Sequence, residues 1–337
     1  MAAATEAMKT ARRIGALGAW EAVFPWNWAV RPSGAKSPFI VCPRPGERPE
    51  VAARLLVFPG WDRFAEYKLF CAKAAPVPAF SPADIEHFEA VFLKSGDPGF
   101  VSFFPGYVPR EMDGEDSPAL RKILRESLGL MMRIEEDSAP NAECARNGAV
   151  LGREETSPGA WRDAPMSPPD ETRTVSTKIP IPKDGVESAK KLPVVPDLKW
   201  DVAFRPVPQL VTPGPERRIF YILAAVDSVS GANARLRLFS VPSGHKRDGL
   251  ARIWGGIARE TLAAFSAAGA IPSELRVSDA RLALFLRPLG LHFPFKITVV
   301  ERLPAAERCL AALHERRFGV RPAPPADGEA AGTKEQA

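Results

Sequence analysis

The stretch ILAAVDSVSGANARLRLFSVP, residues 222–242, carries the pattern that decides the fold of the second half of the chain. An apolar run ends at Asp227, polar residues and Gly231 follow, and arginine then alternates with leucine through residues 235–238. A continuous apolar run is typical of a strand buried on both faces, and strict alternation is typical of a strand with one exposed face. The polar residues between the two runs favour a turn. The stretch therefore predicts a β-hairpin.

The residues on either side of this hairpin predict a domain of about residues 197–320. A strand over 199–211 precedes the hairpin, and its prolines predict an edge position, because proline cannot donate a backbone hydrogen bond to a neighbouring strand. Apolar residues at helical spacing predict a long helix over 248–268. The remaining elements are expected in this order: a strand at 274–279, a helix at 280–290, a strand at 295–301 and a helix that begins at Pro304. This order predicts an α/β domain with a mixed sheet.

Two segments resemble known families. The segment PSELRVSDARLALFL, residues 272–286, is similar to the integrase segment in which a catalytic aspartate follows a short strand. Together with the order of elements, it makes the domain resemble the RNase H-like superfamily, which includes RNase H, retroviral integrases and transposases. The segment FVSFFPGYVPREM, residues 100–112, makes the whole chain similar to a group of uncharacterised bacterial two-domain proteins, described as domains of unknown function. The resemblance to that group implies a fold and no activity.

The RNase H-like resemblance also implies a candidate catalytic site. Enzymes of this superfamily cleave or transfer phosphodiesters with two divalent cations, which prefer carboxylate oxygens as ligands. Asp227 and Asp279 each end a predicted strand and match the metal-binding positions. Glu260 stands in the order where RNase H has its glutamate, and Glu315 has the integrase-like separation from Asp279. If the two strands are neighbours, both aspartates emerge at one edge of the sheet, where they would hold Mg²⁺ or Mn²⁺.

The same residues have a structural interpretation, and the sequence favours it. Asp227, followed by serines and Gly231, is typical of a turn, and Asp279 directly before an apolar helix is typical of an N-cap. Glu260 lies about 90° from the centre of the apolar stripe of its helix. The sequence therefore predicts a degenerate RNase H-like domain in a non-catalytic binding or assembly protein, a role that needs no cofactor. The alternative is a Mg²⁺- or Mn²⁺-dependent nuclease, or another nucleic-acid-processing enzyme, that uses Asp227 and Asp279.

The first half of the chain predicts an α+β domain over residues 14–135. Ser81 followed by Pro82 is typical of a helix start, and apolar residues at Ile85, Phe88 and Phe92 extend this predicted helix. The other predicted elements are strands at 39–43 and 53–58, a helix at 61–73, a strand at 100–112 broken at Pro105-Gly106, and a helix from 117. Residues 136–196 hold nine prolines and predict a disordered linker, and residues 321–337 predict a disordered tail.

Charge and cysteine content set the expected partners and location. The formal net charge is +5, and residues 197–320 hold 18 Lys and Arg against 11 Asp and Glu, a balance of +7. This excess allows a weak contact with nucleic acid through the second domain. The four cysteines are far apart in the sequence, which favours a reducing compartment. The N-terminal residues do not have the length of apolar run that a signal peptide or membrane span needs, so we expect a cytoplasmic protein without a membrane partner.

Overall fold

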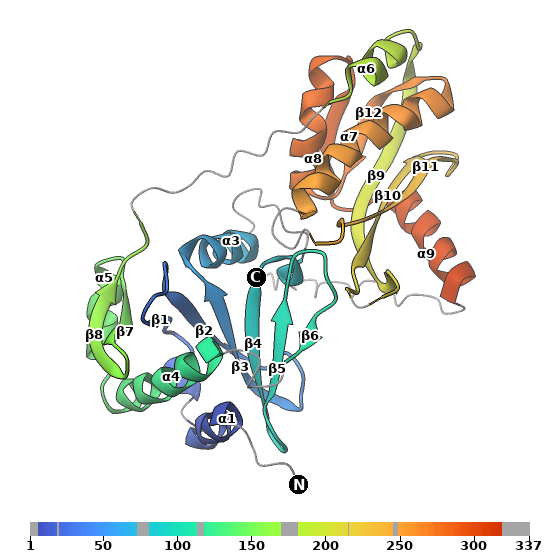
Figure 1. Cartoon of the computed structure of the whole chain (residues 1–337). Coiled ribbons are helices and arrows are strands. Elements are labelled where there is room, and N and C mark those ends of the chain that lie inside the picture. The colour runs from blue at the N-terminus through green and yellow to red at the C-terminus, as the bar shows by residue number, and fades with distance from the viewer. Residues whose placement is uncertain are drawn as a thin grey trace, which may run out of the picture. The chain divides into compact units, whose positions relative to one another are not determined.

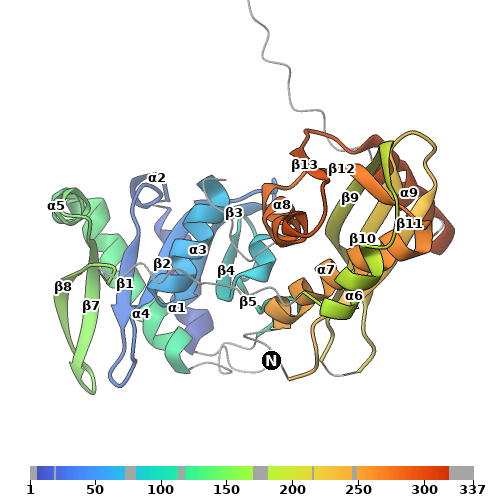
Figure 2. The ribbon, with the colours of Figure 1, turned by 90° about the horizontal axis from the view of Figure 1, so that it is seen from above.

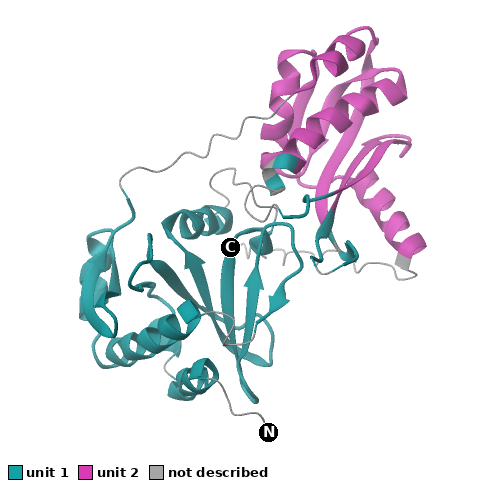
Figure 3. Cartoon of the chain, viewed as in Figure 1, with its two compact units in different colours: residues 1–178, 207–220, 240–252 teal, residues 179–206, 221–239, 253–337 magenta. Residues whose placement is uncertain are grey.

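The computed structural model describes residues 6–18, 20–72, 81–112, 118–169, 181–214, 216–244 and 249–318. The chain splits into two compact units (Figure 3). Unit 1 consists of residues 1–178, 207–220 and 240–252, and unit 2 consists of residues 179–206, 221–239 and 253–337. Both units combine helices with a sheet that contains parallel and antiparallel strand pairs, so the fold is α+β with mixed sheets.

Unit 1 is built on one large sheet (Figure 1). Among the described residues it has eight strands in the order β6-β5-β4-β3-β2-β1-β7-β8. In chain order these are β1 (Trp28–Arg31), β2 (Phe39–Pro45), β3 (Val51–Pro59), β4 (His87–Leu93), β5 (Gly99–Phe103), β6 (Arg110–Glu111), β7 (Val150–Ser157) and β8 (Ala160–Met166). Neighbouring strands pair antiparallel except β1 and β7, which pair parallel.

Helices cover both faces of this sheet, which explains the apolar run of residues 55–58 in its central strand β3. In β3, Leu55 and Val57 pack in the core that includes α1 (Glu6–Leu17), α2 (Trp20–Val23) and α4 (Pro118–Glu136). Leu56 and Phe58 point to the other face, into the core that includes α3 (Trp61–Ala72). Because successive side chains of a strand point to opposite faces, the part of a strand that is covered on both sides reads as a nearly continuous apolar run.

The prediction of a disordered linker over residues 136–196 is wrong for most of that segment. It contains α5 (Ala139–Arg146), the strands β7 and β8, and α6 (Lys183–Ala189). The strand β7 pairs with β1 on one side and with β8 on the other. The sequence of β7 has no apolar pattern that would predict a strand, because its charged side chains form ion pairs instead of packing in an apolar core. Residues 170–180 of the predicted linker, and the predicted tail at 321–337, lie outside the described residues.

The predicted helix after Ser81 is also wrong. Residues Pro82–Asp84 form a single 3₁₀ turn (η1), in which the Ser81 N–H donates to the Asp84 carboxylate at 2.9 Å, and the chain then enters β4. Phe88 and Phe92 are four residues apart, a spacing that fits one face of a helix and one face of a strand equally well. Pairing with β3 and β5 on either side selects the strand.

Unit 2 contains a second sheet, with five strands among the described residues in the order β11-β10-β9-β12-β13. These are β9 (Val194–Val211), β10 (Ile219–Asp227), β11 (Asn233–Ser240), β12 (Ile271–Val277) and β13 (Lys296–Val299). The prediction that β9 is an edge strand is wrong, because β9 lies in the middle of this sheet. Its pairing with β12 uses residues 194–201, and Pro206 and Pro208 fall beyond that paired region. Pro196 lies where the register shifts, which is where a sheet tolerates proline.

The helices of unit 2 divide between the two faces of its sheet, and Figure 2 gives a second view of them. Trp200 of β9 packs against Phe265 of α7 (Gly249–Ala268), with ring centroids 5.5 Å apart. Ala203, which points to the other face of the sheet, packs in the core that includes α9 (Pro304–Phe318). The helix α8 (Ala280–Leu286) and the 3₁₀ turn η2 (Arg287–Leu291) connect β12 to β13. The predicted hairpin and helices therefore lie close to their expected positions.

Hydrogen exchange tests the revised boundary of unit 1. Because both edges of β7 are paired, its amides should exchange roughly a thousandfold or more slowly than those of an unstructured peptide, as in β2 and β3. Amide exchange of the full chain, read by mass spectrometry, gives the rates. Peptide-like exchange over Val150–Ser157, with β2 and β3 protected, would restore the linker interpretation.

Candidate functional site

The strand directions in unit 2 separate the two aspartates that the sequence suggested as a pair. β12 and β13 run parallel to β9, and β10 runs back along β9, with the Ser228 N–H donating to the Lys199 carbonyl at 2.8 Å. Asp227 therefore ends its strand beside Lys199, which pairs with Glu274 in the middle of β12, whereas Asp279 follows the carboxyl end of β12. β9 also lies between their two strands. The condition under which Asp227 and Asp279 would emerge at one edge of the sheet, that their strands are neighbours, is therefore not met.

Asp227 closes the turn between β10 and β11. Its Oδ1 accepts backbone N–H groups from Val229 at 2.9 Å and Ser230 at 2.6 Å, and Gly231 has the positive φ of 74° that the turn requires. Partial burial raises the pKa of this carboxyl, but the hydrogen bonds from Ser230 and Val229 outweigh that effect and lower it. The predicted turn role is confirmed by these contacts.

Asp279 and Glu260 each have a local partner. Asp279 is the N-cap of α8, where its Oδ1 accepts the Arg281 N–H at 2.8 Å, and the Arg281 guanidinium also contacts both of its carboxylate oxygens. Glu260 of α7 is buried, and its Oε2 accepts from Arg235 of β11 at 2.6 and 3.0 Å. Glu315, the fourth suggested carboxylate, is exposed near the end of α9.

A different carboxylate, Asp201, occupies the centre of the unit 2 sheet. It lies on β9 directly opposite Arg276 of β12, and its side chain is completely buried. Arg276 donates to Asp201 Oδ1 through Nε at 2.8 Å and through Nη2 at 2.5 Å. The N–H of Ala305, in the first turn of α9, donates to Asp201 Oδ2 at 3.1 Å. Both oxygens of this carboxylate are therefore held by the protein.

The sequence carries a signal for this buried pair. Asp201 stands between Trp200 and Val202 in an otherwise apolar part of β9. A charged residue inside a buried strand is rare unless it is paired. Because β9 is a central strand, the carboxylate of Asp201 is expected to be buried and to need a cationic partner.

The part of the chain that the structure describes has no group of three or more His, Cys, Asp or Glu side chains placed to hold a metal ion. Residues 245–248, in the polar segment before α7, lie outside the described residues. Within the described helices, none is long and apolar enough to cross a membrane.

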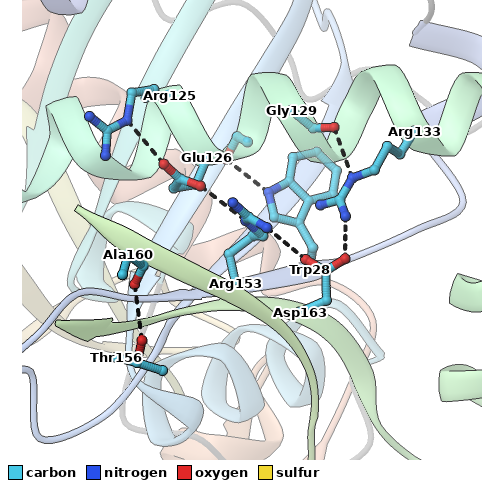
Figure 4. A network of polar contacts seen from close by, with 10 residues as sticks. Trp28, Arg125, Glu126, Gly129, Arg133, Arg153, Thr156, Ala160 and Asp163 are labelled. Carbon is cyan, nitrogen blue, oxygen red and sulfur yellow. Dashed lines mark hydrogen bonds and ion pairs between the residues drawn. The ribbon is translucent and has the colours of Figure 1, made fainter. Parts of the chain in front are cut away.

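Unit 1 has its own network of charged side chains, between α4 and the hairpin of β7 and β8 (Figure 4). Glu126 of α4 is buried and lies between Arg125 and Arg153, with each Nε at 3.0 Å from a carboxylate oxygen. Asp163 of β8 joins Arg153 to Arg133. These alternating charges connect the helix to both strands, so the network stabilises the fold of the hairpin.

Glu155 is the most strongly held carboxylate near this network. Backbone N–H groups of Gly159 and Ser33 each donate to it at 2.9 Å, and Lys122 Nζ lies at 2.7 Å. The N–H of Gly159, the Lys122 ammonium and the N–H of Ser33 lower the pKa of Glu155 to about 2. Its carboxylate therefore fixes the β7–β8 turn, the start of the β1–β2 connection and α4 at one point.

A buried histidine lies on the opposite face of the unit 1 sheet. His87 of β4 stacks on Phe103, with ring centroids 4.4 Å apart and planes inclined by 5°. Its Nδ1 lies 2.7 Å from the Ile85 carbonyl, and its Nε2 lies 3.2 Å from Glu89 Oε1. Both ring nitrogens have a protein partner, which is the arrangement of a histidine that completes a core.

Comparison with known proteins places a family match on unit 2. Residues 186–314 match the family described as Domain of unknown function (DUF6930). The matched range begins in α6, includes β9 through β13, and ends in α9. Neither the curated proteins nor the solved structures contain a match to the chain.

Replacing Arg276 tests the buried pair. Arg276→Ala leaves Asp201 charged and buried, so it should lower the free energy of unfolding by roughly 3–5 kcal/mol. Arg302→Ala, which breaks an exposed pair with Glu307, should cost about 1 kcal/mol or less. Adding Asp201→Asn to Arg276→Ala should recover part of the loss, because a neutral amide needs no cation. Urea denaturation gives these values; equal costs for Arg276→Ala and Arg302→Ala would contradict the assignment.

The low pKa of Glu155 gives a pH dependence. A folded-state pKa of about 2 lies below the unfolded value of about 4.3, so the stabilising contribution is complete above that unfolded pKa and is lost as pH falls through 4 toward 2. Denaturation midpoints of the wild type and Glu155→Gln should therefore differ most near pH 7 and converge near pH 2. Glu136→Gln, on the exposed end of α4, serves as the control. A difference that stays constant across this range would contradict the prediction.

Proposed function

We propose that this protein is a non-catalytic binding or assembly protein, and that its second unit is a degenerate RNase H-like domain. The fold of unit 2 supports the resemblance that the sequence suggested. Three strands, β9, β10 and β11, follow one another in the sheet as in a meander, the long helix α7 follows, and β12 and β13 then add parallel to β9 with helices after each. This is the arrangement of strands and helices expected of an RNase H-like domain.

The observation that carries the non-catalytic part of the proposal is the pair of Asp201 and Arg276. In RNase H-like enzymes, carboxylates at the sheet hold divalent cations, which neutralise them and clamp the reacting oxygens. In this chain, the carboxylate on the central strand is neutralised by a guanidinium fixed on the neighbouring strand. Its second oxygen accepts the Ala305 N–H. A cation would have to displace these partners from a buried position before it could bind, which is strongly unfavourable.

The alternative function is a Mg²⁺- or Mn²⁺-dependent nuclease that uses Asp227 and Asp279. It requires the two carboxylates to share a site, and the strand directions weigh against that requirement. Weak contact with nucleic acid through the basic unit 2 is compatible with both functions. Free cysteines at Cys42, Cys71, Cys144 and Cys309 support a cytoplasmic location, because disulfides are rare in reducing compartments.

Thermal melts with and without Mg²⁺ or Mn²⁺ distinguish the two functions. A metal at ten times its dissociation constant would stabilise the folded chain by about 1.4 kcal/mol and raise the midpoint by roughly 3–8 °C. We expect no such rise. Asp227→Ala and Asp279→Ala should each cost roughly 0.5–2 kcal/mol with or without metal, because each removes hydrogen bonds to backbone N–H groups. A metal-dependent rise that both substitutions abolish would favour the nuclease.

A further inference from the structure

The strand β11 presents an open edge of the unit 2 sheet. It is one of the two terminal strands in the order of described strands, and it spans eight residues, Asn233–Ser240, that include no proline, whereas the other terminal strand, β13, spans four. Alternate backbone N–H and C=O groups of such a strand point away from the sheet and can pair with another strand. Natural proteins often protect such edges with a very short strand, a proline or a bulge. A regular strand of this length is therefore suited to adding a partner strand.

The two faces of β11 differ in chemistry. Leu236 and Leu238 alternate with the arginines, and they are exposed by 36% and 43%. Arg235 and Arg237 lie on the other face, which packs toward Glu260 of α7. An added strand would meet apolar side chains on one face of the sheet and cationic side chains on the other.

The charge on the α7 face is not balanced. Arg235, Arg237 and Arg259 all point to the single carboxylate of Glu260, with N–O distances of 2.6, 3.9 and 3.5 Å. Arg235 makes the close pair, whereas Arg237 and Arg259 keep more than half of their side-chain surface exposed. Among the described residues of this cluster, one carboxylate lies among three guanidinium groups, and this excess of positive charge would attract acidic side chains.

We propose that β11 binds an extended segment of a partner protein in which acidic and apolar residues alternate, so that the segment extends the sheet. The acidic side chains would lie beside Arg237 and Arg259, and the apolar ones would cover Leu236 and Leu238. This inference rests on the proposed binding function and names its partner. A second copy of β11 is disfavoured, because it would place arginines opposite arginines. Nucleic acid would use the arginines but leave the leucines and the backbone edge without partners.

The test uses the full-length protein and the labelled peptide SEVEVEVES, with SKVKVKVKS as the charge-reversed control. Fluorescence anisotropy should give the acidic peptide a dissociation constant on the order of 10–100 μM and the basic peptide no measurable binding. Hydrogen exchange at Asn233–Ser240 should slow when the acidic peptide is bound. Methylating the backbone nitrogens of alternate peptide residues blocks one edge of the peptide strand. One of the two methylated sets should therefore lose binding, and the other should keep it.

Variants locate the contact. Arg237→Glu should weaken the acidic peptide roughly tenfold or more, and Arg237→Lys should retain most of the affinity. Arg287→Glu, an exposed charge reversal on η2, should have little effect, and thermal melts should show that all three variants fold.

Equal binding of both peptides, or no binding of either, would overturn the inference. So would displacement of the bound peptide by duplex DNA at physiological salt, or self-association of the chain that Leu238→Lys abolishes. The proposed function itself would be overturned by a different result, which is stabilisation of the folded chain by Mg²⁺ or Mn²⁺. The two tests can therefore fail separately.

Discussion

The side chain of Asp201 has no exposure to solvent, and its two oxygens are held by Arg276 of β12 and by the first turn of α9. Moving a carboxylate out of water costs several kcal/mol, and good geometry with its partners offsets that cost. The pair therefore depends on the register of β9 against β12 and on the position of α9. A shift of either strand by one residue would move Asp201 or Arg276 to the opposite face.

In unit 1, ion pairs hold the strands β7 and β8 in place at one edge of the sheet. The strand β7 has few apolar side chains, and its position beside β1 is held by backbone pairing and by carboxylates that reach several elements at once. Glu155 joins Gly159, Ser33 and Lys122, and Glu126 joins Arg125 to Arg153. These pairs are partly buried, so solvent screens them less than surface pairs. A polar hairpin can thus belong to a folded unit without an apolar pattern of its own.

Three of the four carboxylates that the sequence suggested for a metal site have structural partners in unit 2. Asp227, Asp279 and Glu260 each hold a backbone N–H or an arginine, as Asp201 does in the central strand. The proposed binding surface is β11, one of the two terminal strands of the described sheet, where exposed leucines and arginines occur together. It is separate from the buried pair of Asp201 and Arg276.

The sequence by itself determined the elements whose patterns are local. The apolar run of β10, the alternation in β11, the amphipathic helices α4 and α7, the turn at Asp227 and the cap at Asp279 all follow from periodicity and side-chain hydrogen bonding over a few residues. Only the tertiary structure decided that β9 is central, that residues 87–93 form a strand, and that β7 and β8 complete the unit 1 sheet. It also decided that Asp227 and Asp279 lie apart, and that Asp201 meets Arg276, 75 residues away in the chain. The physical reason is that strand order, direction and charge pairing depend on contacts between distant residues, and a local pattern does not record those contacts.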